Sequence, residues 1–212
     1  GGKQITPTLI DRIQDRNGMT TFRHDERPCA NCTVEAWADQ PPPKLPDPRE
    51  RLIQPGTAYQ MVSMLKGVVD RGTGRRIGQL KLPLAGKTGT TNDSLDTWFI
   101  GFAPDLAVGV FVGFDTPRTL GRRETGSSVP APIFKDFMAH ALDGKPVIPF
   151  RVPPDIRLVR VNPETGLVAL PGERATILEA FKPGTAPLEF GSIVGEDLGR
   201  GANTGGPRRG IY

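Results

Sequence analysis

Apolar positions between residues 57 and 70 repeat at helical spacing and predict an amphipathic helix. The stripe consists of Met61, Val62, Leu65, Val68 and Val69. Thr57, followed three residues later by Gln60, has the form of a capping box at the start of this helix. The segment Gly72-Thr73-Gly74 comes after the last stripe residue and is expected to end the helix.

The same spacing predicts a second helix over about 131–143. Its apolar positions are Ile133, Phe134, Phe137, Met138, Ala141 and Leu142. Pro130 and Pro132 stand near its start, where a missing N–H group costs nothing, and we expect Ser128 or a neighbour to cap it. Gly144 is expected to end it.

Three short strands are predicted between the helices, over residues 84–90, 98–102 and 107–114. The last two are rich in aromatic and β-branched residues and are joined by a tight turn at Pro104-Asp105, so we expect them to pair antiparallel. Trp98 and Phe99 alternate along the middle strand, and we expect both in the core rather than in a substrate platform. The fold class is therefore α+β.

Two hairpins and a long loop complete the prediction. Residues 5–23 form a hairpin around Asn17-Gly18, and residues 156–170 form a second one around 162–166. Residues 24–55 are rich in proline and are expected to be a long loop around Trp37. From about Gly191 onward, glycine, proline and arginine dominate, which predicts a disordered tail.

Composition and charge exclude several classes of protein. The net charge of +4 is too small and too scattered to indicate a nucleic-acid partner. The longest apolar run, residues 106–114, falls well short of the roughly 20 residues that a membrane-spanning helix needs. The start of the chain has no signal-peptide pattern. The chain has only two histidines and two cysteines, and we expect no metal and no cofactor.

The candidate chemistry lies at Lys87-Thr88-Gly89, at the first predicted strand. Gly86-Lys87-Thr88 has the ending of a phosphate-binding loop, but that motif needs a glycine at position 81, where this chain has Lys81. The other motif that contains Lys-Thr-Gly is the active-site strand of serine penicillin-recognising enzymes. We reject the first interpretation and follow the second.

Several segments, in order, make this resemblance specific. The stretch from Leu84 through Lys87-Thr-Gly-Thr-Thr-Asn92 to Pro104 resembles the transpeptidase domain of class A, bifunctional penicillin-binding proteins. The segments 57–74 and 128–138 are similar too. The resemblance covers residues 1–145 and extends weakly beyond them. It implies a partial β-lactamase/transpeptidase-like fold, in which an antiparallel sheet is flanked by helices. Residues 1–148 would be the C-terminal part of that domain, 149–190 a hairpin extension and 191–212 the tail.

The resemblance also implies roles for single residues. Lys87 would place a cation in the cleft and assist proton transfer around a serine nucleophile. The hydroxyl groups of Thr88 and Thr90 would bind the carboxylate of a donor peptide or a β-lactam, and the N–H of Thr90 would be an oxyanion donor. Gly89 would let the substrate lie close to the strand. Thr91 and Asn92 would extend the binding segment.

Two motifs of the family are missing from this chain. It has no Ser-x-Asn, and its only Ser-x-x-Lys, Ser63-Met-Leu-Lys66, falls within the first predicted helix rather than in a nucleophile helix. We therefore expect that Ser63 is not the nucleophile and that this chain alone cannot be acylated. An incomplete sheet is also expected to leave an unpaired edge and an uncovered apolar face, which favour self-association.

The implied partners are peptidoglycan stem peptides, β-lactam inhibitors and the missing N-terminal part of the parent protein, which would carry a glycosyltransferase and a membrane anchor. The implied location is the periplasmic face of the cytoplasmic membrane. There, Cys29 and Cys32 favour a local disulfide, with free thiols as the open alternative. A carboxypeptidase or β-lactamase activity and a non-enzymatic cell-wall-binding module remain alternative functions.

Overall fold

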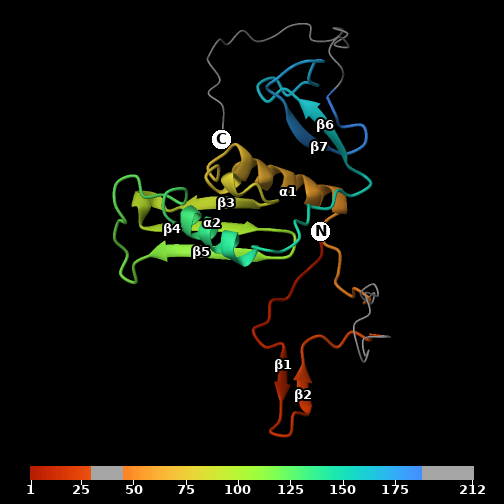
Figure 1. The fold of residues 1–212 in the computed structure, drawn as a ribbon, viewed down its shortest axis with the longest axis vertical. Coiled ribbons are helices and arrows are strands. Elements are labelled where there is room, and N and C mark those ends of the chain that lie inside the picture. Colours follow the sequence, from red (N-terminus) through yellow and green to blue (C-terminus); the bar gives the residue numbers. More distant parts are fainter. Residues whose placement is uncertain (30–44, 188–212) are drawn as a thin grey trace, which may run out of the picture. The chain divides into compact units, whose positions relative to one another are not determined.

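The computed structural model describes residues 1–29 and 45–187. The chain forms two compact units, Gly1–Gln54 and Pro55–Tyr212 (Figure 1). The predicted boundary at residues 148 and 149 stays a prediction, and the predicted tail lies outside the described residues.

The first unit contains the predicted hairpin. Strands β1 (Arg12–Gln14) and β2 (Thr20–Arg23) pair antiparallel. The Asp15 carboxylate accepts hydrogen bonds from the N–H groups of Asn17 and Met19, both at 2.8 Å. Gly18 has a φ of +80°, which a residue with a side chain rarely adopts. The described residues on either side of the gap, 24–29 and 45–54, form only one bridge, between Arg51 and Lys3, as expected for a loop. Trp37 lies outside the described residues.

Helix α1 (Pro55–Asp70) begins two residues earlier than predicted. Proline suits the first turn of a helix, so Thr57 becomes an interior residue and the predicted capping box is wrong. Gln60 instead donates its Nε2–H to the Ala180 carbonyl, 2.9 Å away. The end of the helix is as predicted, because Gly72 and Gly74 donate their N–H groups to the Val68 carbonyl at 3.2 and 2.9 Å.

The central sheet has three antiparallel strands, β3 (Ala85–Thr90), β4 (Asp96–Phe102) and β5 (Ala107–Gly113), in the order β3-β4-β5. A 3₁₀ turn at Ile77–Leu80 precedes β3, and another at Asn92–Ser94 joins β3 to β4. All three strands were predicted, with the start of β4 placed two residues late. Together with the two helices, they confirm the α+β class (Figure 1).

The core lies between one face of this sheet and the two helices. Helix α2 (Pro130–Ala141) contributes Phe134 and Met138, both fully buried, and the ring of Phe134 lies 4.8 Å from that of Phe99. A side chain at Gly101 would lie 2.7 Å from Phe134, so the helix needs a glycine at this position to approach the sheet.

The prediction of a side-chain cap for α2 is wrong. The N-cap residue is Val129, which makes no side-chain cap hydrogen bond. The Ser128 hydroxyl instead accepts the N–H of Thr125 at 2.8 Å, because the chain turns tightly just before the helix. Proline at the start of the helix removes one N–H that a cap would otherwise satisfy.

The second predicted hairpin is present only in part. Strand β6 (Arg157–Val161) pairs along its whole length with β7 (Ile177–Phe181), whereas residues 167–170 pair only with its end. The nearer segment makes only one bridge, from Val168 to Val161. This nearer segment then turns away from β6. The Glu173 carboxylate accepts hydrogen bonds from the Leu170 N–H, at 2.9 Å, and from the Asn162 side-chain amide, and these two bonds close a second turn.

The opposite face of the sheet is apolar and open among the described residues. Side chains alternate along a strand, so Trp98, Ile100 and Phe111 share this face, and they are 42%, 56% and 50% exposed. The expectation that Trp98 belongs to the core is therefore wrong, whereas Phe99 is fully buried as expected. Trp98 and Phe111 pack together with ring centroids 4.8 Å apart.

Candidate functional site

The Lys-Thr-Gly motif lies on β3, which is an edge strand of the described sheet. The Thr91 N–H donates to the Asp96 carbonyl at 3.1 Å. Hydrogen-bonded and non-hydrogen-bonded pairs alternate in an antiparallel ladder. The main-chain groups of Thr88 and Thr90 are therefore directed away from β4, toward the free edge. A peptide that pairs with this edge would meet those groups first.

Lys87 is exposed, and its ammonium group lies beside the same edge. Its Nζ donates to the Thr88 carbonyl at 3.0 Å and lies 3.5 Å from the Thr88 hydroxyl oxygen. Lys87 stands opposite Ile100 in the register, so its side chain leaves the sheet on the apolar face. This arrangement places one positive charge next to a row of main-chain groups.

Thr88 and Thr90 have their side chains on the other face, each in contact with a loop from elsewhere in the chain. The Thr88 hydroxyl lies 2.9 Å from the hydroxyl of Thr73. The Thr90 hydroxyl accepts the N–H of Gly126 at 3.0 Å. The two loops meet where Ser127 donates its hydroxyl to the Thr73 carbonyl at 2.7 Å. Both candidate carboxylate-binding hydroxyls are therefore held by hydrogen bonds.

Gly89 and Gly126 make a close contact between the strand and the second loop. A Cβ at Gly126 would lie 2.6 Å from the Trp98 carbonyl oxygen and 2.7 Å from the Gly89 carbonyl oxygen. Only a glycine allows this segment to approach the backbone so closely. A Cβ at Gly89 would meet only the Trp98 Cβ, at 3.3 Å.

Thr91 and Asn92 lie where the strand ends. The Thr91 hydroxyl accepts the Asp96 N–H at 2.8 Å and donates to the Asp96 carbonyl at 3.2 Å. Asn92 begins the 3₁₀ turn, and Asp93 follows with a φ of 58°. The side chain of Thr91 thus closes the turn between β3 and β4, and its contribution to substrate binding stays a prediction.

The Ser-x-x-Lys of helix α1 has surface geometry. Lys66 forms an ion pair with Asp70 one helical turn later, and both side chains are nearly half exposed. Such i,i+4 pairs are ordinary features of solvated helix faces. Ser63 lies in the middle of the helix. Its exclusion as a nucleophile stays a prediction.

Cys29 is disulfide-bonded, and Cys32 lies outside the described residues. The histidines carry no catalytic constellation in the described part of the chain. His140 Nδ1 lies 2.8 Å from the Asp136 carbonyl on the exposed side of α2. Among the described residues, no group of three or more His, Cys, Asp or Glu side chains could hold a metal ion.

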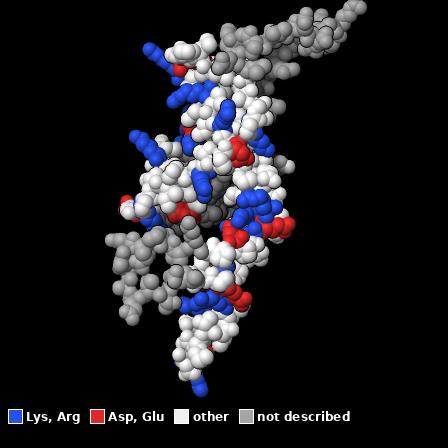
Figure 2. Space-filling view, turned by 90° about the vertical axis from the view of Figure 1, so that its right-hand side faces the viewer, with Lys and Arg blue, Asp and Glu red and all other residues white. Residues whose placement is uncertain are grey.

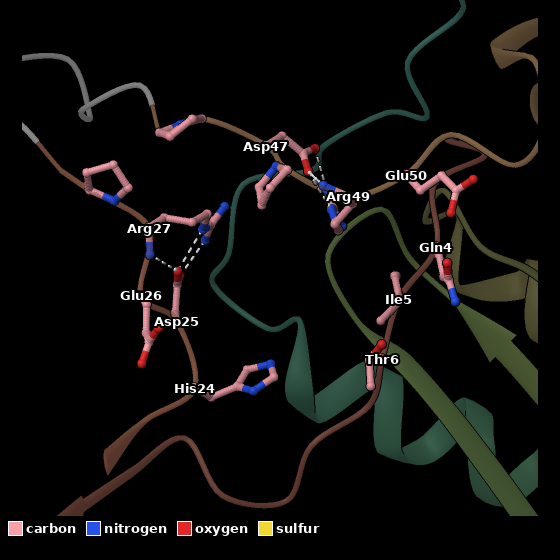
Figure 3. A pocket seen from close by; sticks show the side chains of 13 residues that line it. Gln4, Ile5, Thr6, His24, Asp25, Glu26, Arg27, Asp47, Arg49 and Glu50 are labelled. Carbon is pink, nitrogen blue, oxygen red and sulfur yellow. Dashed lines mark hydrogen bonds and ion pairs between the residues drawn. The ribbon is translucent and has the colours of Figure 1, made fainter. Parts of the chain in front are cut away.

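A pocket of about 830 Å³ lies within the first unit, lined by residues 4–6, 24–28 and 46–50 (Figure 3). Two Asp-x-Arg turns face it. The Arg27 guanidinium hydrogen-bonds the Asp25 carboxylate and holds its pKa well below the usual range. Arg49, helped by Lys3, does the same for the pKa of Asp47. Because both guanidinium groups are already paired, the pocket offers little free positive charge to a ligand.

Charged side chains of both signs are interspersed on the face drawn in Figure 2, without one continuous basic patch. No helix among the described residues is long and apolar enough to cross a membrane. The absence of a nucleic-acid partner stays a prediction.

Two hydroxyl-bearing residues of this site, Thr73 and Ser127, were not predicted. Thr73 belongs to the glycine-rich end of α1, and Ser127 precedes α2. They are 54 positions apart, and neither has a local sequence signature for its contact. Only the packing of both loops against β3 reveals them.

Comparison with known proteins identifies the class to which this arrangement belongs. Residues 1–139 match the family described as "Penicillin binding protein transpeptidase domain". The chain therefore belongs to the penicillin-binding protein transpeptidase family. Within this family it resembles the type named penicillin-binding protein 1A.

Three relatives illustrate that resemblance. The penicillin-binding protein 1A of Rickettsia bellii is 48% identical over 86% of this chain and 23% of its own length. That of Pseudomonas aeruginosa is 39% identical over 93% of this chain and 28% of its own length. The crystal structure of penicillin-binding protein 1A from Haemophilus influenzae superimposes with a TM-score of 0.68 at 29% identity, over 89% of this chain and 31% of that one. The chain thus spans about a quarter of the length of the curated relatives.

Proposed function

We propose that this chain is the part of a peptidoglycan D,D-transpeptidase that binds the donor peptide, and that β-lactams inhibit the parent protein at the same place. The observation that carries the proposal is the free edge of β3, where Lys87, two threonine hydroxyls and outward-directed main-chain groups lie side by side. A stem peptide ending in D-Ala-D-Ala offers an extended backbone and a terminal carboxylate, which this edge complements.

The proposed reaction is acyl transfer in two steps. A serine from outside this chain attacks the carbonyl of the penultimate D-alanine, and the bond to the terminal D-alanine breaks. The serine proton passes through basic groups around the nucleophile to the departing amine. The amine of a second stem peptide then attacks the ester, forms the cross-linking amide and releases the serine. In a β-lactam the attacked amide is in the ring, so the leaving group stays attached.

This chain's own residues stabilise and orient the reacting groups. The Lys87 ammonium raises the positive potential at the edge and favours the charged carboxylate of the ligand. The Thr90 N–H, directed to the free edge, is suited to donate to the oxyanion of the tetrahedral intermediate. Loss of one such donor typically slows a reaction by about 10²–10³-fold.

The test compares this chain with the intact protein that carries it. Fluorescent penicillin should label the intact protein covalently and should leave the chain of residues 1–212 unlabelled after denaturation. In the intact protein, Lys87→Ala should strongly reduce labelling, whereas Lys66→Ala, on the surface of α1, should leave it near the wild-type rate. An intact protein that takes no label would overturn the proposal, and labelling of the isolated chain would refute its dependence on an outside nucleophile.

A further inference from the structure

Two loops that are distant in sequence each place a hydrogen-bonding group on one threonine hydroxyl of β3. Thr73, just after α1, has its hydroxyl oxygen 2.9 Å from that of Thr88. The Gly126 N–H, just before α2, lies 3.0 Å from the Thr90 hydroxyl oxygen. Ser127 ties the loops together through its 2.7 Å hydrogen bond to the Thr73 carbonyl.

The partners of the two hydroxyl groups fix the direction of the proton at Thr90 and leave two directions open at Thr88. A threonine hydroxyl has one proton and two lone pairs. At Thr90 the partner is a main-chain N–H, which can only donate, so the Thr90 oxygen accepts and its proton is free to point elsewhere. At Thr88 the Lys87 ammonium is one donor near the oxygen, at 3.5 Å. The hydroxyl of Thr73 is the second neighbour.

We propose that Thr73 is a positioning residue for the candidate site: its hydroxyl donates to Thr88, so that the single proton of Thr88 is directed to a ligand carboxylate. The inference rests on the proposed function. Thr88 and Thr90 then both act as donors, which suits an anionic acceptor. Ser127 holds the Thr73 main chain in place, and a chain of oriented hydrogen bonds is stronger than its separate links.

The first experiment measures the rate at which the intact protein is acylated by a fluorescent penicillin. Thr73→Val removes the donor and keeps the shape, and it should slow acylation by about 3- to 10-fold, the effect of losing one hydrogen bond. Thr73→Ser keeps the hydroxyl and should restore a rate within about twofold of wild type. Thr185→Val is the matched control, because this exposed hydroxyl only donates to the nearby Lys182 carbonyl.

The second measurement separates positioning from a general structural effect. A penicillin and its methyl ester differ only in the carboxylate, so the ratio of their acylation rates reports recognition of that group. Thr73→Val and Thr88→Val should both lower this ratio, and the double variant should lower it no further, because Thr73 acts through Thr88. Ser127→Ala should lower the same ratio by a smaller factor.

The outcomes are distinguishable. A purely structural role slows both compounds equally and leaves the ratio at its wild-type value, which would overturn the inference. Additive losses in the double variant would also overturn it. If Thr73→Val fails to fold by circular dichroism, Ser127→Ala decides by the same ratio. If the wild-type protein itself is not acylated, the proposed function fails and the inference falls with it.

Discussion

The close approach of Gly126 to β3 leads to a sharp stability prediction. In Gly126→Ala, the new methyl group would lie 2.6 Å from the Trp98 carbonyl oxygen and 2.7 Å from the Gly89 carbonyl oxygen. Both are backbone atoms in a paired sheet, so they cannot turn aside as a flexible side chain would. The loop must move instead, and its hydrogen bond to Thr90 is lost.

The expected cost follows from these two effects. Overpacking of this kind typically destabilises a protein by about 1–3 kcal/mol, and a lost hydrogen bond adds about 0.5–1.5 kcal/mol. We expect Gly126→Ala to lower the free energy of unfolding of the second unit by about 2–4 kcal/mol. In the intact protein it should also slow acylation, because Thr90 loses its partner.

Urea unfolding followed by Trp98 fluorescence measures this cost. A Trp37→Phe background removes the other tryptophan, so the signal comes from β4. Gly109→Ala is the matched control in the same sheet, because its nearest neighbour would be Ile100 Cγ1 at 3.8 Å. The control should stay within about 0.5 kcal/mol of wild type. Equal unfolding midpoints for the two alanine variants would refute the steric reasoning.

Three further predictions concern the core, the exposed sheet face and the first unit. Phe134→Ala should lower the free energy of unfolding in urea by about 3–5 kcal/mol, because this ring is fully buried against Phe99. Phe137 is half exposed on the same helix, so Phe137→Ala should lower it much less. Similar losses in the two variants would contradict the assigned core. The chain on its own should self-associate through the apolar sheet face. Ile100→Glu should therefore lower its apparent mass by light scattering, whereas the control Ile148→Glu, outside the sheet, should not. A wild-type chain that is already monomeric would count against this prediction. The hydrogen bonds from Arg49 and Lys3 lower the pKa of Asp47. Their stabilising effect should therefore be complete above the ordinary pKa of about 3.9 and should be lost as the pH falls through the lower folded-state pKa. In an NMR titration, the Asp47 midpoint should rise toward the ordinary value in Arg49→Ala, and an unchanged midpoint would exclude the pairing.

Predictions from local sequence patterns agreed well with the structure where the determining contacts are themselves local. The Asn17-Gly18 hairpin, the glycine-rich end of α1 and the three strands all depend on turn chemistry and apolar periodicity within a few residues. The strand that carries Lys-Thr-Gly was among those predicted, and the family indicated by the resemblance of this motif and its neighbouring segments is confirmed by the comparisons.

Two of the errors share a different cause. Gln60 was expected to cap its own helix, but it binds Ala180 on β7, 120 positions away. Strand β6 was expected to pair with the segment just after its turn, yet only its end does so, and its full length pairs with β7 once Glu173 has closed a second turn. In both cases a distant segment competes with the local partner, and a local pattern contains no information about that competition.

The sequence by itself determined which strand carries the lysine and the hydroxyl groups, because Lys87, Thr88 and Thr90 belong to one short contiguous motif. Tertiary structure alone decided that Trp98 faces outward while Phe99 is buried, since only the packing of α1 and α2 selects one face of the sheet. It also decided that Thr73 reaches Thr88 on β3 and that Ser127 reaches Thr73. Their hydrogen bonds join segments 15 to 54 residues apart, and only the folded core brings those segments together.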